Sequence, residues 1–475
     1  MTFVRLLLPA LALVAAARAA DRPNIIFILA DDLGYTDVSC YGSKYYETPN
    51  IDRLALEGLK FTNGYTNAPN CQPTRAALLS GQYGPRTGIY TVGGIDRFDW
   101  RSQALRPVDN VTTLPAEKIT IAQALKGAGY ATGLFGKWHL GNGPEAHPSK
   151  RGFDEAIVSN GKHFDFDTDP KTAYPEGTYL ADFITGKAVD FIGRHKDGPF
   201  FLYVPHFGVH APYQAKPELI AKFRAKAAAG GHDDPVYAAM LASVDESVGR
   251  ITAKLDELGI AENTLVIFSS DNGGVGGYQR EGIQAKDTTD NSPLKAGKGS
   301  LHEGGIRVPY VFRWKGKIPP GSVSAQPIAS IDLYPSTLEL AGAKKPENQV
   351  LDGVSYVSHL KDPANTKVGR DALFWHFPGY LGAGNNTWRT KPVSVVRSGS
   401  WKLIQSLEDQ SLQLYNLDED LGEKSNLAAA QPEKAKELLA KLDAWRADIK
   451  APLPIKNEPQ DSVPDDGKRK NRRNK

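Results

Sequence analysis

Cys71 lies in a segment whose residue types suit covalent chemistry next to an anion. Residues 70–81 have the sequence NCQPTRAALLSG. Pro73 is favoured in the first turn of a helix, so we predict that a helix begins at or just before Cys71 and continues to Ser80. Such a helix start carries unpaired N–H groups and a partial positive charge, and Arg75 adds a cation one turn further on. The segment predicts a cysteine beside an anion site or, alternatively, a buried cysteine before an ordinary helix.

Oxygen ligands suited to a metal ion follow two apolar runs of the chain. Asp31 and Asp32 follow the first run, and Asp271 and Asn272 follow a later one. Carboxylate and amide oxygens prefer Ca²⁺ or Mg²⁺ to zinc or copper. Either pair alone could be a turn or a helix cap. Both pairs at strand ends of one sheet predict a single divalent-cation site.

Basic and imidazole side chains follow further apolar runs. Lys137 and His139 follow one run, His210 follows another, and Lys298 lies in a glycine-rich segment. Positioned cations and N–H donors stabilise the negative charge that develops on oxygen during ester hydrolysis. A lysine is by default a solvated surface residue, so these side chains indicate a site only if the fold brings them together.

The apolar runs and helical patterns around these groups predict an α/β fold. Apolar runs at residues 24–30, 130–135, 200–204 and 264–268 suit strands covered on both faces, as in a parallel sheet. Helical patterns at residues 119–129 and 237–258 alternate with these runs, and Gly259 suits a helix C-terminus. We therefore predict a large, mostly parallel sheet flanked by helices. Ligands of such sheets bind outside the carboxyl ends of the strands, where the polar groups described above fall.

The character of the chain changes after about residue 365. Short strand patterns at residues 372–377, 393–397, 401–405 and 411–415, followed by a helical pattern at 432–447, predict a smaller α+β subdomain with an antiparallel sheet. We assign residues 20–365 to the catalytic domain and residues 366–456 to this C-terminal subdomain. Residues 457–475 are polar and end in a basic run, which predicts a disordered tail.

Residues 1–19 have the features of a signal peptide. Arg5 precedes an apolar run from Leu6 to Ala16, and residues 17–19, Ala-Arg-Ala, fit a cleavage pattern. The alternative is a membrane anchor, but spanning a bilayer takes about 20 apolar residues. No later segment is apolar enough to span. The sequence therefore predicts an exported protein, periplasmic or secreted, without a stable membrane span.

Charge and cysteine content narrow the function further. The formal net charge is only +3, and no basic stripe occurs before the C-terminus, so a nucleic-acid partner is not expected. The chain has two cysteines, Cys40 and Cys71. In an exported protein they could form one disulfide, although the motif around Cys71 favours a different role.

Taken together, these segments resemble the type I sulfatases of the alkaline phosphatase superfamily. Cys71-x-Pro73-x-Arg75 is similar to the motif whose cysteine is oxidised to formylglycine in that family. A lone motif of this kind would be weak. Further blocks occur in the family order and span most of residues 22–450: DDLG at 31–34, GKWHLG at 136–141, HAP at 210–212, SDNG at 270–273 and KGSLHEGG at 298–305.

The resemblance implies a sulfuric ester hydrolase with formylglycine at position 71 and one divalent cation, calcium being favoured over magnesium. It implies a formylglycine-generating enzyme as a partner during maturation. A hydroxyl of the hydrated residue 71 would attack sulfur, and the second hydroxyl would then re-form the aldehyde and release sulfate. The ligands that it implies for the ion are Asp31, Asp32, Asp271, Asn272 and the modified Cys71.

The resemblance also implies roles for the basic groups. Lys137 would bind a sulfate oxygen with Arg75, and His139 is our candidate base. His210 and Lys298 are candidates for protonating the leaving alcohol. These roles are less firmly fixed than membership of the site, and Ser159 and His163 lie in the right region but remain unassigned.

Export and the resemblance favour sulfated polysaccharide or oligosaccharide fragments as substrates, without fixing the sugar or the sulfate position. Arg97, Trp100, Arg101 and the segments 276–291 and 374–389 could border the substrate or simply cover the surface. Two alternatives stay open: a phosphonate monoester or phosphodiester hydrolase of the same superfamily, and a non-catalytic protein that binds sulfated glycans. The lysine-containing blocks favour the sulfatase, and no expected nucleophile or ligand is missing.

Overall fold

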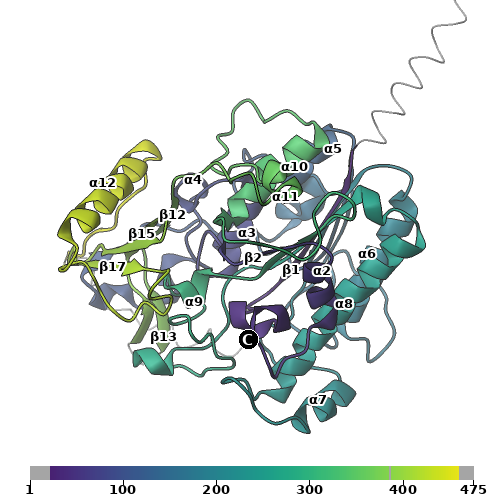
Figure 1. Ribbon diagram of the computed structural model, residues 1–475, viewed down its shortest axis with the longest axis horizontal. Helices are drawn as coiled ribbons and strands as arrows, with labels where there is room; N and C mark the ends of the chain where they lie inside the picture. The colour runs from purple at the N-terminus through teal and green to yellow at the C-terminus, as the bar shows by residue number, and fades with distance from the viewer. Residues whose placement is uncertain (1–21, 385–386, 459–475) are drawn as a thin grey trace, which may run out of the picture.

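β1 (Asn24–Ala30) lies inside an eight-stranded sheet with the strand order β10-β2-β9-β8-β1-β7-β5-β6 (Figure 1). The computed structural model describes residues 22–384 and 387–458. β1 pairs in parallel with both of its neighbours, and β9 is antiparallel to the two strands beside it. The prediction of a mostly parallel sheet is therefore confirmed. The other strands are β2 (Leu59–Phe61), β5 (Ala131–Gly136), β6 (Glu155–Val158), β7 (Phe200–Pro205), β8 (Thr264–Ser270), β9 (Tyr310–Arg313) and β10 (Ser322–Ser324).

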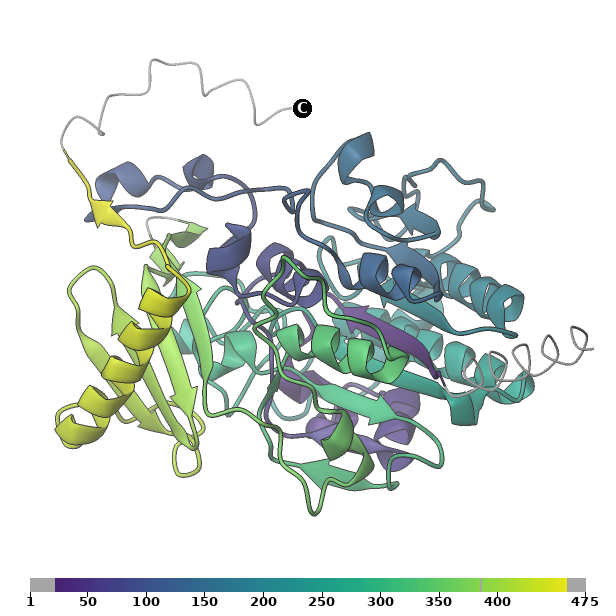
Figure 2. The same cartoon turned by 90° about the horizontal axis from the view of Figure 1, so that it is seen from above.

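Both faces of the sheet are buried. Successive side chains of each strand point to opposite faces, so each strand contributes to a core on either side. Ile26 and Ile28 of β1 belong to the core on one side, whereas Ile25 and Phe27 belong to the core on the other. The first side is covered by α2 (Pro49–Leu56), α6 (Leu180–His195), α7 (Pro217–Arg224) and α8 (Pro235–Glu257). The second is covered by α3 (Cys71–Ser80), α5 (Ile121–Gly127), α10 (Leu333–Ala341) and α11 (Val357–Lys361), as Figure 2 shows from above.

The longest helix shows how local sequence sets the boundaries of an element. The helix α8 begins two residues before the predicted start, because Pro235 occupies its first turn and the Asp234 carboxylate accepts the N–H groups of Val236 and Tyr237. Gly259 has a φ of 69°, which a residue without a Cβ adopts most easily. The prediction from apolar spacing was correct for the body of the helix and missed only its cap. None of the helices in the described part of the chain is both long and apolar enough to cross a bilayer.

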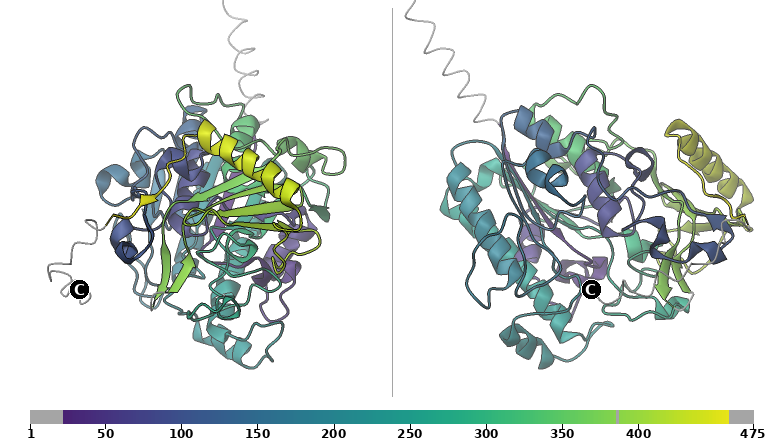
Figure 3. Two further views of the ribbon diagram at one scale, coloured as in Figure 1. Left: turned by 90° about the vertical axis from the view of Figure 1, so that its left-hand side faces the viewer. Right: turned by 180° about the vertical axis from the view of Figure 1, so that it is seen from behind.

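The C-terminal subdomain is an antiparallel sheet with one long helix on its outer face (Figure 3). Its strands follow the order β12 (Leu373–Phe377), β15 (Val393–Ser398), β16 (Trp401–Ser406) and β17 (Leu412–Asn416). The helix α12 (Pro432–Asp448) buries Leu438 and Leu442 against the sheet. The opposite face contributes Trp375 and Ile404 to a core shared with Tyr65 of the catalytic domain. The predicted antiparallel subdomain is thus confirmed.

The C-terminal end of the described chain returns to the catalytic domain. A two-residue strand, β18 (Ile455–Lys456), pairs with β4 (Leu105–Arg106), and the N–H of Asn457 donates to the carbonyl of Ala104 at 3.0 Å. The predicted signal peptide at residues 1–19 and the rest of the predicted tail after Glu458 lie outside the described residues. Both stay predictions.

A buried cation holds the two domains together. The Lys402 ammonium on β16 lies 2.9 Å from a carboxylate oxygen of Glu303 and 2.9 Å from one of Glu423, and all three side chains are fully buried. The other Glu303 oxygen accepts hydrogen bonds from Arg307 and Tyr65. Burial by itself would raise the pKa of Glu303, but Lys402 and Arg307 hold that pKa well below its usual range. Glu303 begins α9 (Glu303–Ile306), so this network fixes the segment that carries Lys298.

Replacement of Lys402 by methionine should destabilise the whole protein. It leaves two buried carboxylates without their shared cation, and removal of one partner from a buried ion pair typically costs about 3–5 kcal/mol. The matched control is Lys391→Met, because Lys391 is half-exposed in its pair with Glu408 and such pairs contribute at most about 1 kcal/mol. Chemical and thermal unfolding measure both changes. Equal stabilities of the two variants would contradict the role given to Lys402.

Candidate active site

The carboxyl edge of the sheet brings together the polar groups that follow its central strands. Asp31 and Asp32 follow β1, and Asp271 and Asn272 follow β8, its immediate neighbour. The N–H of Asp32 donates to an Asp271 oxygen at 3.2 Å, and the Asn272 amide donates to an Asp32 oxygen at 2.8 Å. All four side chains are buried. The two oxygen-rich pairs that the sequence singled out therefore form one cluster.

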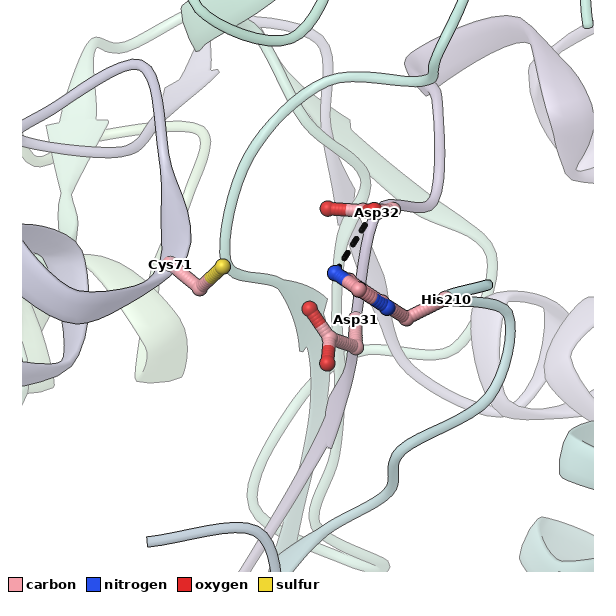
Figure 4. Close-up of side chains that lie close together, drawn as sticks. All are labelled: Asp31, Asp32, Cys71 and His210. Carbon is pink, nitrogen blue, oxygen red and sulfur yellow. Dashed lines mark ion pairs between the residues drawn. The ribbon is translucent and has the colours of Figure 1, made fainter. Parts of the chain in front are cut away.

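Cys71 is the first residue of α3 and points into this cluster. Figure 4 shows its sulfur directed toward Asp31, Asp32 and His210. The ligand atoms of these four residues lie within 4.8 Å of one another. The helix begins where the Pro73 position predicts, and Gly81 ends it with a φ of 68°. The N-terminus of α3, with its partial positive charge, therefore faces the carboxyl edge of the sheet.

Arg75 ties α3 to the strand ends. Its Nε and Nη2 atoms lie 2.9 and 2.7 Å from one carboxylate oxygen of Asp271, and Nη1 donates to the carbonyl of Lys137 at 2.8 Å. The side chain is completely buried. A planar guanidinium can satisfy a carboxylate and a carbonyl at once, whereas a lysine ammonium is a single compact charge. Arg75 thus orients α3, β8 and the end of β5 relative to one another.

Two lysines neutralise the carboxylates that follow β1. Lys137 Nζ lies 2.5 Å from an Asp31 oxygen, and Lys298 Nζ lies 2.7 Å from an Asp32 oxygen. Burial alone would raise the pKa of Asp31, but Lys137, His210 and Arg75 together hold it far below its usual range. Three buried carboxylates, those of Asp31, Asp32 and Asp271, therefore face three buried or nearly buried cations, those of Arg75, Lys137 and Lys298.

Lys137 and His139 depend on a close contact between β5 and β7. At Gly136, a Cβ would lie 2.0 Å from the carbonyl oxygen of Pro205, so no other residue fits there. His139 has a φ of 63°, and its Nδ1 is buried without a hydrogen-bond partner in the described structure. Burial, followed by the nearby Lys137 and Arg75, lowers the pKa of His139 to about 3. Its imidazole is therefore neutral near pH 7.

His210 lies at the open side of the cluster. Its Nε2 is 3.7 Å from an Asp32 oxygen, and about a quarter of the side chain, 28%, is exposed. The Nδ1 atom lies 2.6 Å from the carbonyl of Ala211. A carbonyl can only accept, which assigns the proton to Nδ1 and leaves Nε2 facing the cluster and the solvent.

The cluster fits a hard divalent cation. The buried oxygens Asp31 Oδ1 and Asn272 Oδ1 lack a hydrogen-bond partner, as expected of atoms whose partner is a cation. The ligand atoms of Asp31, Asp32, Cys71 and His210 lie within 4.8 Å of one another, close enough to surround one ion. By contrast, both Asp271 oxygens already contact Arg75 or the Asp32 N–H. The assignment of Asp271 and Asn272 as ligands stays a prediction.

Cys71 is a free thiol in this structure, and so is Cys40, so the possible disulfide between them does not form here. Burial raises the pKa of Cys71 to about 11, with Lys137 and Lys298 opposing that shift. Without modification or a metal ion, the thiol stays protonated at neutral pH and is a poor nucleophile. The place of Cys71 at a helix start suits an anion or a nucleophile, but its ordinary thiol is too weakly ionised to be that nucleophile.

Comparison with known proteins identifies this arrangement. Residues 23–343, more than half of the chain, match the family model described as sulfatase, and residues 297–448 match the model described as N-sulphoglucosamine sulphohydrolase, C-terminal. The chain belongs to the sulfatase family. It is a type I sulfatase of the alkaline phosphatase superfamily and hence a sulfuric ester hydrolase of a metal-dependent family.

Several relatives resemble this sulfatase over most of its length. A sulfatase of Formosa agariphila is 37% identical over 94% of this chain and 92% of its own. The N-acetylgalactosamine-6-sulfatase of Sus scrofa is 38% identical over 71% of this chain and 65% of its own. The crystal structure of Ps i-CgsB superposes with a TM-score of 0.75 at 32% identity, over 92% of this chain and 96% of its own, and a complex of that protein with k-i-k-neocarrahexaose is also known.

The structure gives specific contacts to two residues of the segments 276–291 and 374–389, which the sequence indicated only as possible borders of the substrate. Tyr278 is buried, and its hydroxyl donates to the carbonyl of Lys298 at 2.7 Å, which holds the backbone of that lysine. The guanidinium of Arg389 lies over the Tyr278 ring at 4.6 Å. A tyrosine in a loop carries no local pattern that could have revealed this role. The Ser159 hydroxyl donates to the carbonyl of Asp167, and the His163 ring contacts the carbonyl of His210 at 2.9 Å, so the His163 side chain supports the backbone of His210.

Proposed function

We propose that this sulfatase hydrolyses sulfate esters of saccharides, with residue 71 converted to formylglycine and a divalent cation bound beside it. The observation that supports this most directly is the position of Cys71: a buried helix start that faces Asp31, Asp32 and His210. The saccharide class comes from the relatives, which are named for sulfated N-acetylgalactosamine or solved with a neocarrahexaose.

The electrostatics of residue 71 favour formylglycine. A buried thiol with a pKa of about 11 has little thiolate at neutral pH. A sulfated thiol or serine would also be slow to cleave, whereas the hydrated aldehyde has a second hydroxyl that can expel sulfate. The oxidation changes only the side chain, so the helix position and its anion-binding N–H groups are kept.

Asp31, Asp32, Asp271 and Asn272, with residue 71, would hold the cation. Their hard oxygens favour Ca²⁺ or Mg²⁺ over zinc or copper, and the resemblance to type I sulfatases favours Ca²⁺. Such an ion lowers the pKa of a hydroxyl on residue 71 and neutralises charge on the sulfate. The unpartnered oxygens of Asp31 and Asn272 support the presence of a cation beside them.

The surrounding side chains divide the proton transfers. Lys137 and Lys298, beside Asp31 and Asp32, bind sulfate oxygens as charge develops. His210 lies on the exposed side, where an alcohol leaves. Because Nδ1 already carries a proton that faces the Ala211 carbonyl, Nε2 would protonate that oxygen from the imidazolium form of the ring. His139 is buried and neutral, so its imidazole can accept the proton of the second hydroxyl.

We further propose that the protein is exported and matured by a formylglycine-generating enzyme. The signal-peptide pattern of residues 1–19 supports export. Since Cys71 is only 2 % exposed after folding, a large modifying enzyme would reach it before α3 packs against the sheet.

Parallel assays on an aryl sulfate and an aryl phosphonate monoester test the reaction class. We expect kcat/KM to be higher for the sulfate by at least about tenfold, which corresponds to about 1.4 kcal/mol of transition-state stabilisation. Cys71→Ala should abolish both activities and keep the fold. A faster phosphonate reaction would instead assign the chain to the phosphonate hydrolase alternative.

Peptide mass spectrometry tests the modification. Trypsin releases the peptide Phe61–Arg75, and we expect active enzyme to carry formylglycine at position 71 in it. Cys40 is the internal control, because burial raises its pKa to about 12 and it should remain an ordinary thiol. Fully active protein with unmodified Cys71 would contradict the proposed formylglycine modification.

Removal of the cation should cost activity more than structure. A ligand bound only by the folded state stabilises it by about 3 kcal/mol when its free concentration is about a hundredfold above Kd. Because Arg75, Lys137 and Lys298 already offset the three carboxylates, the chelated protein should stay folded but unfold at a lower Tm. Activity should return with Ca²⁺. Full activity in protein shown by elemental analysis to be metal-free would rule out the site.

A further inference from the structure

Arg97 lies on a surface segment that is attached to the residue after Cys71. The N–H of Gly93 lies 3.4 Å from the side-chain oxygen of Gln72. The Arg97 side chain folds back along this segment: its Nη1 donates to the carbonyl of Val92 at 3.2 Å, and its Cδ lies 3.6 Å from where a Cβ of Gly93 would be. Arg97 therefore lies at the rim next to the start of α3.

Arg389 approaches the same place from the C-terminal subdomain. It belongs to β14 (Thr387–Thr390), which pairs with β13 (Leu381–Gly384). Its guanidinium lies over the Tyr278 ring, and its Cδ is 3.1 Å from where a Cβ of Gly299 would be. Since Gly299 follows Lys298, Arg389 lies directly against the segment that carries a catalytic lysine.

Aromatic contacts bring the two arginine-bearing segments together. The rings of Phe98 and Trp388 meet edge to face with centroids 6.2 Å apart, and Phe98 packs so closely on Gly382 that a Cβ there would lie 2.7 Å from it. Figure 2 shows the segment around residues 95–106 beside the C-terminal subdomain. Partial burial lowers the pKa of Arg97, and so does Arg389, whereas Cys71 acts in the opposite direction. Arg97 is thus within electrostatic range of both residues.

Neither guanidinium forms an ion pair with a carboxylate of the described residues. The neighbouring Asp96 pairs with Arg101 at 2.9 Å. The Nε of Arg389 is buried and has no hydrogen-bond partner within the described structure. Two positively charged guanidinium groups that lie near each other repel, and the buried Nε of Arg389 still has an N–H to donate. A bound anion would relieve the repulsion and accept that hydrogen bond.

We propose that Arg97 and Arg389 bind a second anionic group of the substrate, a sulfate or a carboxylate, on the sugar that carries the scissile sulfate or on its neighbour. This inference rests on the proposed sulfatase function and narrows its substrate to saccharides with at least two negative groups. The planar donor fork of arginine matches both kinds of oxyanion. The exposed parts of Phe98 and Trp388 provide apolar surface for the sugar ring between the two anions.

Competition against hydrolysis of 4-methylumbelliferyl sulfate tests this. The probes are N-acetylgalactosamine 6-sulfate, its 4,6-disulfate, and the 6-sulfate linked to glucuronate, which separate a second sulfate from a carboxylate. We expect at least one dianionic probe to compete about tenfold more strongly than the monosulfate. In Arg97→Gln, Arg389→Gln and the double variant, this preference should fall, most of all in the double variant.

Lys391→Gln is the matched control, because it removes a cation two residues from Arg389 that already pairs with Glu408. It should keep the full preference for dianionic probes. An active wild-type enzyme without such a preference, or a double variant that retains it, would overturn the inference while leaving the sulfatase function intact. If the glutamine variants do not fold, two measurements still test the proposal. They are the preference of the wild-type enzyme for dianionic probes and the same preference in Arg97→Lys and Arg389→Lys. Absence of any sulfate-ester hydrolysis would instead reject the proposed function itself.

Discussion

The buried pair between Arg75 and Asp271 is the interaction on which the rest of the site depends. It joins α3, which carries Cys71, to β8, and through the Lys137 carbonyl it also reaches β5. Each partner would be prohibitively expensive to bury alone, so the helix start and the strand ends must be assembled together. The remaining carboxylates, Asp31 and Asp32, are then neutralised by Lys137 and Lys298 around the same point. A site with balanced charges can fold first and still accept a cation and an anionic ester.

The C-terminal subdomain is more than a cover for the sheet. Its Lys402 holds Glu303, which begins the short helix directly after the Lys298 segment. Its Arg389 and the catalytic domain's Tyr278 enclose the same segment from the other side. The position of Lys298, which we propose to bind sulfate, therefore depends on contacts between the domains. This coupling explains why a single buried ammonium far from the sulfate site matters for the architecture.

If the proposed second anion site is correct, the same contacts place substrate selection at the domain boundary. The groups that we propose to bind the scissile sulfate come from the sheet edge and α3. The rim comes from a surface segment of the catalytic domain and from the β13–β14 hairpin, elements that can vary without disturbing the core. Chemistry and specificity are thus carried by different parts of the chain, and they meet between Cys71 and Lys298.

The sequence by itself determined the four central strands β1, β5, β7 and β8 of the main sheet, the helix beginning at Cys71, and which polar residues meet at the edge of that sheet. The reason is that continuous apolar runs define buried parallel strands, and polar residues directly after such runs must lie at one edge. It could not show that Asp271 would pair with Arg75, that Lys298 would be held by Tyr278, or that Arg97 and Arg389 would converge. Those facts depend on packing between segments that are separated along the chain, by 196 residues for Arg75 and Asp271 and by 20 for Tyr278 and Lys298, and no local pattern predicts them. Periodicity fixes which face of an element is buried, but only the tertiary structure decides which distant side chain meets it there.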